Sequence, residues 1–459
     1  MSQIMRDRSF YKQLAILSIP IALQNLIGFG VNMMDTVMLG SLGQDQISAS
    51  SLANQPFFIL TLFFFGLSSG ASVLTSQYWG KRDTRTISRV IGLAVRASLL
   101  FSAVFAFVVL VFPEAVMSIY TTDPHVILLG TQFLRIIGFS YILSAFSTTF
   151  LNVIRSVESV RIPLLINFIT FAVNTVLNWI LIYGKFGMPA LGIRGSATAT
   201  LIARVIELTL SCLFAFRFDQ KIRLRLRDVM RFDNALFHDF LHYSLPVVVN
   251  ETMWGVGMTL QSVVVGHMGS EAVAANSIAS VVQRLAMVYT FGLASSAAVL
   301  VGKEIGSGNE KRARSVASTL LLISIAAGLV SSAVIILLRA PFAMIYNVPA
   351  STKELSMQIM LVFSVIVFFS AFNCSNIVGV LRGGGDTRFA LALDITLMYV
   401  VALPLGALAG LYWHLPVPIV FFLLLCDEPM KCIIGIFRFR SGRWLRNVTR
   451  ETVPDGENN

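Results

Sequence analysis

Twelve long apolar stretches, separated by polar or turn-rich residues, constrain the fold of this chain more than any other feature. A helix needs about 20 apolar residues to cross a bilayer. The expected spans cover residues 14–39, 50–77, 88–112, 125–153, 161–184, 194–216, 239–266, 273–302, 314–338, 355–381, 389–411 and 416–437. With 56% hydrophobic and only 13% charged residues, the chain cannot cover itself with polar surface. We therefore exclude a soluble or disordered protein and predict an all-α polytopic membrane protein with twelve transmembrane helices.

The basic residues predict the orientation of these spans. Of the 35 Lys and Arg residues, 27 fall on the side that carries both termini, four in the opposite loops and four inside spans. Because cytosolic loops are enriched in Lys and Arg, we expect both termini in the cytosol. We attribute the net charge of +11 to topology and lipid contact, and expect no nucleic-acid partner. The first apolar stretch lacks a cleavage site and is expected to remain as a helix.

The chain repeats itself at an interval of 226 residues. This shift places Pro20 on Pro246 and Gly66 on Gly292, and a weaker echo relates Arg155 to Arg382. Since six spans return the chain to the same side, we expect two parallel lobes related by an axis along the membrane normal. The two prolines are expected kink sites. The predicted parts are an N-terminal lobe, a basic cytosolic linker, a C-terminal lobe and a cytosolic tail, at residues 1–218, 219–237, 238–440 and 441–459.

Several motifs resemble the multidrug and toxic compound extrusion (MATE) family, and the bacterial NorM-type members most. They are residues 32–40 (NMMDTVMLG), 77–81 (QYWGK), 184–192 (GKFGMPALG), 195–200 (GSATAT) and 381–388 (LRGGGDTR). The resemblance covers all twelve spans. It implies a V-shaped pair of lobes that exports organic, mostly cationic compounds in exchange for inward Na+ or H+. The expected partners are therefore small-molecule drugs and the lipid bilayer, with no cofactor besides the coupling ion, and we expect a monomer.

Asp35 is the most informative polar residue inside a span, because no basic residue lies within a helical turn of it. Such a carboxylate either stays protonated or binds a cation. Asn174 and Asn178 are four residues apart and share a helix face, and their amide oxygens suit Na+. The resemblance implies that these three residues and Thr200 form the cation site of the first lobe. Some relatives carry Asp where Asn178 stands, so this site is less acidic; we favour Na+ and leave H+ open. A structural Asp35, and asparagines that only join helices, are the alternatives.

Glu251 is the corresponding candidate in the second half. Family members carry a functional Glu about one turn further along this helix, and an Asp in span ten that residues 371–376 (AFNCSN) lack. By depth in the membrane, Arg284 is the nearest candidate partner of Glu251. We therefore expect Glu251 and Arg284 to form either a structural ion pair or a second coupling or substrate site.

Other polar residues are expected to pair. Arg204 and Glu207, three residues apart, predict a local ion pair. Lys431 could pair with Asp427 or with Glu428. The four cysteines and five histidines show no ligand spacing, so we expect neither a disulfide framework nor a metal site.

Other functions fit the sequence less well. A lipid-linked precursor flippase of a related family would need a cavity with several basic residues, and few lie within the spans. An integral-membrane enzyme is disfavoured because HExxH and DDxxD motifs are missing. A channel would show a filter loop or a charged ring, and neither is evident in the sequence. Direct use of ATP would need a P-loop, which the sequence does not contain.

Overall fold

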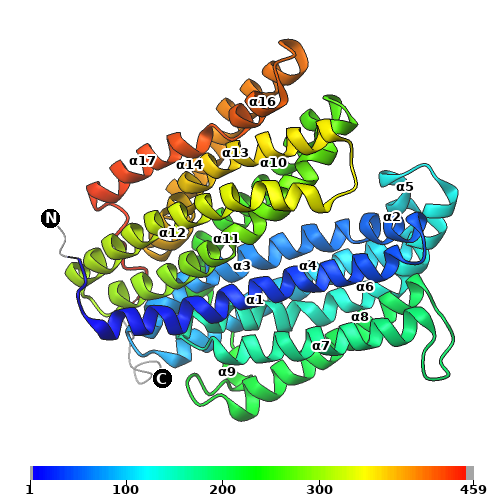
Figure 1. Cartoon of the computed structure of the whole chain (residues 1–459). Helices are drawn as coiled ribbons and strands as arrows, with labels where there is room; N and C mark the ends of the chain where they lie inside the picture. Colours follow the sequence, from blue (N-terminus) through cyan, green and yellow to red (C-terminus); the bar gives the residue numbers. More distant parts are fainter. Residues whose placement is uncertain (1–3, 451–459) are drawn as a thin grey trace.

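The computed structural model describes residues 4–450, which are helical apart from turns and loops (Figure 1). The first half contains α1 (Arg8–Gly40), α2 (Gln44–Ala53), α3 (Gln55–Gly80), α4 (Thr84–Val111), α5 (Pro113–Tyr120), α6 (Pro124–Val153), η1 (Ile154–Val157), α7 (Arg161–Tyr183), α8 (Ile193–Leu213) and η2 (Phe214–Phe218). After α9 (Leu226–Met230), the second half contains α10 (Asn234–His267), α11 (Ser270–Gly306), α12 (Glu310–Ile345), α13 (Ala350–Asn373), η3 (Cys374–Leu381), α14 (Thr387–Thr396), η4 (Leu397–Ala402), α15 (Leu403–Ala407), η5 (Leu408–Tyr412), α16 (Val417–Leu424) and α17 (Asp427–Ser441).

The twelve predicted spans are confirmed. Within the described residues, ten helices are long and apolar enough to cross a membrane. The remaining two spans are α10, which carries polar side chains such as Asn250 and Glu251, and the pair α16 and α17. This last span is interrupted because Pro429, in the first turn of α17, has no N–H to donate to the carbonyl of Leu425.

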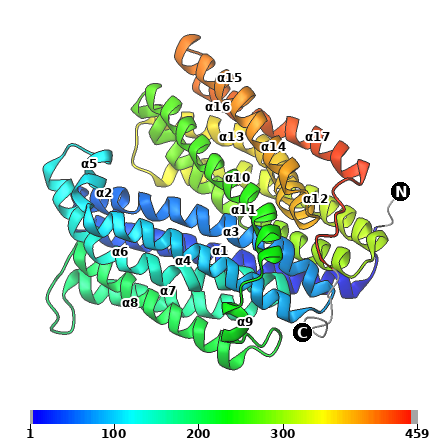
Figure 2. The same ribbon diagram turned by 180° about the vertical axis from the view of Figure 1, so that it is seen from behind.

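The helices form two bundles that diverge toward one end of the molecule. Helices α1 to α8 make one lobe and α10 to α17 the other, and both described ends of the chain lie at the opposite, closed end (Figures 1 and 2). The predicted V-shaped, two-lobe architecture is therefore confirmed. Pro20 and Pro246 lie inside the uninterrupted helices α1 and α10, and kinks at these residues stay a prediction.

Repeat-related glycines let the two lobes cross. Helix α3 packs against α10, and helix α11 packs against α1, so the second membrane span of each half meets the first span of the other. A Cβ atom on Gly66 would lie 2.7 Å from the Cα of Val248, and one on Gly292 would lie 2.6 Å from the carbonyl oxygen of Ser18. Larger side chains at these two positions would push the backbones apart. Because Gly66 and Gly292 are repeat-related, the lobes meet through two equivalent glycine contacts.

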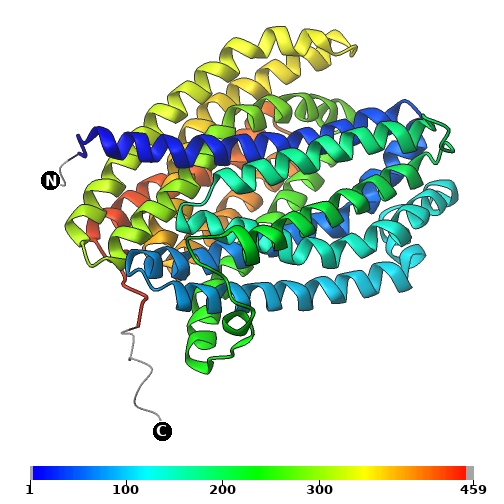
Figure 3. The same ribbon diagram turned by 90° about the horizontal axis from the view of Figure 1, so that it is seen from below.

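The segment between the lobes alternates buried and exposed side chains. Ile222 and Leu224 are buried, whereas Arg223 and Arg225 are exposed. Helix α9 follows and packs against α4, where the absence of a side chain on Gly92 admits the backbone of Val229. Seen from below, this segment projects beside the helix ends (Figure 3).

The last described residues, 442–450, cross from the second lobe to the first, and we call them the C-terminal strap. Trp444 is fully buried. The amide nitrogen of Gln77 in α3 donates to the carbonyl of Arg446 at 3.0 Å, and its amide oxygen accepts from the backbone of Val448 at 2.8 Å. Arg450 pairs with Asp239 of α10 at 2.5 Å. The strap thus joins both lobes at the closed end.

Candidate cation site

The four residues predicted as the first-lobe cation site lie together. Asp35 extends from α1, Asn174 and Asn178 from one face of α7, and Thr200 from α8. Asn178 donates a hydrogen bond to the carboxylate of Asp35 and another to the amide oxygen of Asn174, at 3.2 Å. Asn174 in turn donates to the hydroxyl of Thr200 at 3.2 Å. A single hydrogen-bonded chain therefore joins α1 to α7 and α8.

This cluster has the chemistry of a monovalent-cation site. Both asparagines are buried, and the amide oxygen of Asn178 has no hydrogen-bond partner. A buried acceptor without a donor is costly, and a cation would satisfy it. Among residues 4–450, no Lys or Arg side chain forms an ion pair with Asp35. Carboxylate, amide and hydroxyl oxygens are the hard ligands that such an ion needs.

Arg204 does not compete for this carboxylate. It pairs with Glu207 on the same helix at 2.5 Å, which confirms the predicted local ion pair. Its guanidinium also lies over the ring of Phe57, 5.6 Å from the centroid. Arg204 is therefore engaged by Glu207 and forms no ion pair with Asp35.

The predicted partner of Glu251 was wrong. Glu251 pairs with Arg382, at the end of η3, with 2.7 Å between Oε1 and Nη1. Both side chains are buried, whereas Arg284 is exposed on α11. Similar depth in the membrane did not determine which helix faces meet. No spacing rule connects Arg382 to Glu251, so the sequence carried no local signal for this pair.

Lys431 is the centre of a polar cluster in the second lobe. Its ammonium lies 2.7 Å from Asp427 and 3.9 Å from Glu428, so both predicted partners are confirmed. It also pairs with Asp394 of α14 at 3.1 Å. Three carboxylates thus surround one ammonium that belongs to the protein itself.

Two asparagines that sequence reasoning missed complete this cluster. Asn250 of α10 donates to Asp394 at 3.1 Å, and Asn373 of α13 donates to Glu428 at 2.8 Å. Their amide oxygens are buried without a partner. Asn373 stood in a stretch noted only for lacking an Asp, and the available signal was its position inside a span.

The candidate sites differ from those of a metalloenzyme. Within residues 4–450, no group of three or more His, Cys, Asp or Glu side chains could hold a metal ion. The first-lobe cluster offers one carboxylate with neutral oxygens, and the second-lobe cluster already contains its own cation. The two repeat-related halves therefore differ, because only the Asp35 cluster has a carboxylate without an ammonium partner.

Comparison with known proteins identifies the family. Residues 20–180 and residues 246–408 each match the MatE family. The chain belongs to the MatE family. The two matched stretches begin at Pro20 and Pro246, so this match follows the 226-residue repeat. Members of the MatE family are transporters, and the predictions of a MATE resemblance and of a protein that is not an enzyme are confirmed.

Relatives in bacteria and solved structures agree with this assignment. The chain is 23% identical over 456 residues to a probable multidrug resistance protein NorM of Thermotoga maritima, covering 97% of this chain and 96% of that protein. It is 28% identical to a multidrug resistance protein NorM of Burkholderia vietnamiensis, with 87% and 86% covered. A crystal structure of a Vibrio cholerae MATE transporter superposes with a TM-score of 0.86 at 16% identity, covering 96% of this chain and 98% of that one. A multidrug resistance MATE transporter in an outward-facing conformation has a TM-score of 0.86 at 19% identity, with 95% and 97% covered.

Proposed function

We propose that this MatE protein is an efflux antiporter that exports organic, mostly cationic and amphipathic compounds in exchange for inward Na+ or H+. It would do so as a monomer in a bacterial inner membrane, with both termini in the cytosol. The observation that carries this proposal is the hydrogen-bonded cluster of Asp35, Asn174, Asn178 and Thr200. Within residues 4–450 no basic side chain forms an ion pair with Asp35. The names of its relatives support export of drugs.

Coupling would act through α1. Asp35 is held to α7 by Asn178, so a proton or Na+ that arrives at the carboxylate changes the contact that anchors this helix. Pro20 has no N–H to donate to the carbonyl of Ile16, so α1 lacks one backbone hydrogen bond there. This weak point lies about four helical turns before Asp35. A change of charge at Asp35 can therefore move the outer part of α1 and alter the space that holds the exported compound.

Drug accumulation in cells tests this proposal. Cells that express the protein should retain less ethidium than control cells, and Asp35→Asn should raise ethidium to the level of cells without transporter. Asp45→Asn is the matched control, because Asp45 is an exposed carboxylate on α2. Unchanged efflux by Asp35→Asn at equal expression would contradict the role of Asp35.

A second candidate, the lipid-linked precursor flippase, is favoured by one observation. A cavity between the lobes is lined by two arginines, Arg155 and Arg382, although Glu251 already pairs with Arg382. Proteoliposomes that flip a polyprenyl-pyrophosphate lipid but do not transport ethidium would favour this candidate over drug efflux.

A further inference from the structure

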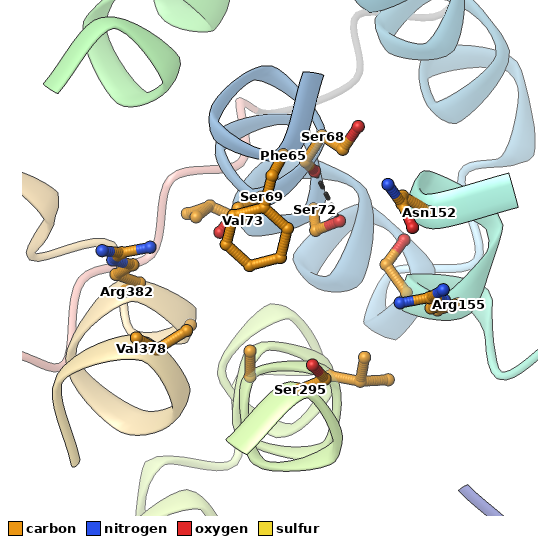
Figure 4. A pocket seen from close by; sticks show the side chains of 14 residues that line it. Phe65, Ser68, Ser69, Ser72, Val73, Asn152, Arg155, Ser295, Val378 and Arg382 are labelled. Atoms are coloured by element: carbon orange, nitrogen blue, oxygen red, sulfur yellow. Dashed lines mark hydrogen bonds between the residues drawn. The ribbon is translucent and has the colours of Figure 1, made fainter. Parts of the chain in front are cut away.

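The cavity between the lobes has a composition unlike that of the Asp35 cluster. Its volume is about 60 Å³, and it lies among α3, the end of α6 with η1, α11 and η3. Arg155 and Arg382 approach it from opposite sides, with Phe65 and Ser69 of α3 between them (Figure 4). No carboxylate lines the cavity. Its charge is therefore positive, in a protein expected to carry cations.

The two arginines are in different electrostatic states. The guanidinium of Arg382 is already bound to Glu251 at 2.7 Å. Arg155 forms no ion pair among residues 4–450, and its Nε is buried without a hydrogen-bond acceptor. The nearest carboxylate in sequence, Glu158, is engaged by Lys303 at 2.6 Å. Arg155 is therefore a cation at the cavity wall without an anionic partner.

Neutral donors surround this unpaired cation. Ser69, Ser295 and Asn152 line the cavity, and their side chains form no hydrogen bond with other protein groups in residues 4–450. Ser69 and Ser295 are related by the 226-residue repeat, as Arg155 and Arg382 nearly are. Each half thus contributes a serine and an arginine to the same cavity. Hydroxyl, amide and guanidinium donors together recognise an oxyanion.

An apolar surface stands beside these donors. Phe65, which is 38% exposed, lines the same cavity, as does Val378. A planar or greasy compound that places one oxyanion against Arg155 can therefore rest its apolar part on Phe65. Leaving a charge partly desolvated and unpaired is costly, and such a ligand would supply the missing partner.

We propose that this cavity binds a single oxyanion, the carboxylate of an amphipathic compound that the transporter carries, so that zwitterions are preferred to their purely cationic esters. Arg155 is the residue that contacts the carboxylate, and Ser69, Ser295 and Asn152 are the supporting donors. The proposal rests on the proposed efflux function, because it concerns exported compounds that enter the cavity between the lobes.

Binding of two matched dyes tests this proposal. A rhodamine with a free benzoate and its methyl ester differ only in the carboxyl group, and fluorescence anisotropy measures the affinity of each for the purified protein. We expect the carboxylate dye to bind about tenfold more tightly, as one charge-assisted hydrogen bond would give. Arg155→Gln should abolish this preference without changing the affinity for the ester, and Arg155→Lys should restore part of it. Arg135→Gln, at an exposed arginine of α6, is the control and should behave as wild type.

Other outcomes overturn the proposal. If Arg155→Gln weakens both dyes equally, or leaves the tenfold preference intact, Arg155 does not bind the carboxylate. If neither dye binds while cells still expel ethidium, the cavity is not a subsite of the transport path, although the proposed efflux function stands.

Repeating the measurement in bilayers of phosphatidylcholine with and without phosphatidylglycerol separates two sources of the oxyanion. Loss of the preference only with phosphatidylglycerol supports the same site, occupied by a lipid phosphate.

Discussion

Gly80 and Gly306, 226 residues apart in the sequence, pack against each other where α3 and α11 end. A Cβ atom on Gly80 would lie 3.0 Å from the carbonyl carbon of Gly306 and would overlap the backbone of Lys303. One on Gly306 would overlap the backbone of Gln77. The two lobes thus touch backbone to backbone at the closed end of the molecule, on the axis that relates the two halves.

Adding a methyl group at this contact should destabilise the protein. Gly80→Ala and Gly306→Ala should each cost about 1–3 kcal/mol, because neither backbone can move aside without opening the contact. The melting temperature of the purified protein measures this loss. Gly28→Ala is the control, since a Cβ there meets no atom within 4 Å, and it should be neutral or slightly stabilising. Equal melting temperatures for all three variants would contradict the backbone contact.

The C-terminal strap should depend on Gln77. Removing its side chain with Gln77→Ala deletes the hydrogen bonds to Arg446 and Val448, which together stabilise the docked strap by on the order of 1–2 kcal/mol. Trypsin should then cleave the native protein within the strap about tenfold faster. Gln44→Ala, at an exposed position on α2, should leave the cleavage rate unchanged. A rate for Gln77→Ala equal to that of wild type would show that other contacts hold the strap.

Stability measurements can distinguish the observed ion pair of Glu251 with Arg382 from the pair with Arg284 that the sequence predicted. Glu251→Gln leaves the buried guanidinium of Arg382 without its partner and should destabilise the protein by about 3–5 kcal/mol. Arg284→Gln should change stability little, because Arg284 is exposed. Thermal unfolding of both variants distinguishes the two pairings, and the opposite order of melting temperatures would exclude the pair seen here.

The cluster around Lys431 should be sensitive to charge. Lys431→Met leaves three carboxylates near one another and should lower stability by about 3–5 kcal/mol. The double variant Lys431→Met with Asp427→Asn removes part of the repulsion and should recover part of the loss. Lys185→Met, at an exposed loop position, is the control. Additive rather than compensating effects of the two changes would argue against their interaction.

The elements that sequence alone could predict are those governed by local or periodic signals. Span lengths follow from runs of apolar residues, and the repeat from matching positions such as Pro20 and Pro246. Asn174 and Asn178 could be placed on one face because helical spacing is regular. Their joining to Asp35 and Thr200 was expected only from the family resemblance, because no local rule relates residues on three helices.

The relationships that sequence did not predict depend on how helices rotate and cross. The choice of Arg382 over Arg284 as partner of Glu251 depends on which faces of α10 and η3 meet. Asp394 joins Lys431 through contact between two spans, and the strap docks through Gln77, which lies more than 360 residues away in the chain. Long-range geometry of this kind leaves no periodic trace in a single sequence.

Transport by the purified protein in liposomes tests the role of Asp35 most directly. An inward Na+ gradient and an inward H+ gradient, imposed separately, identify the coupling ion by which of them drives ethidium in the opposite direction. We expect at least one gradient to drive transport by wild type and by Asp45→Asn, and neither gradient to drive it in Asp35→Asn. Gradient-driven transport by Asp35→Asn at the wild-type rate would contradict the assignment of Asp35 as the coupling residue.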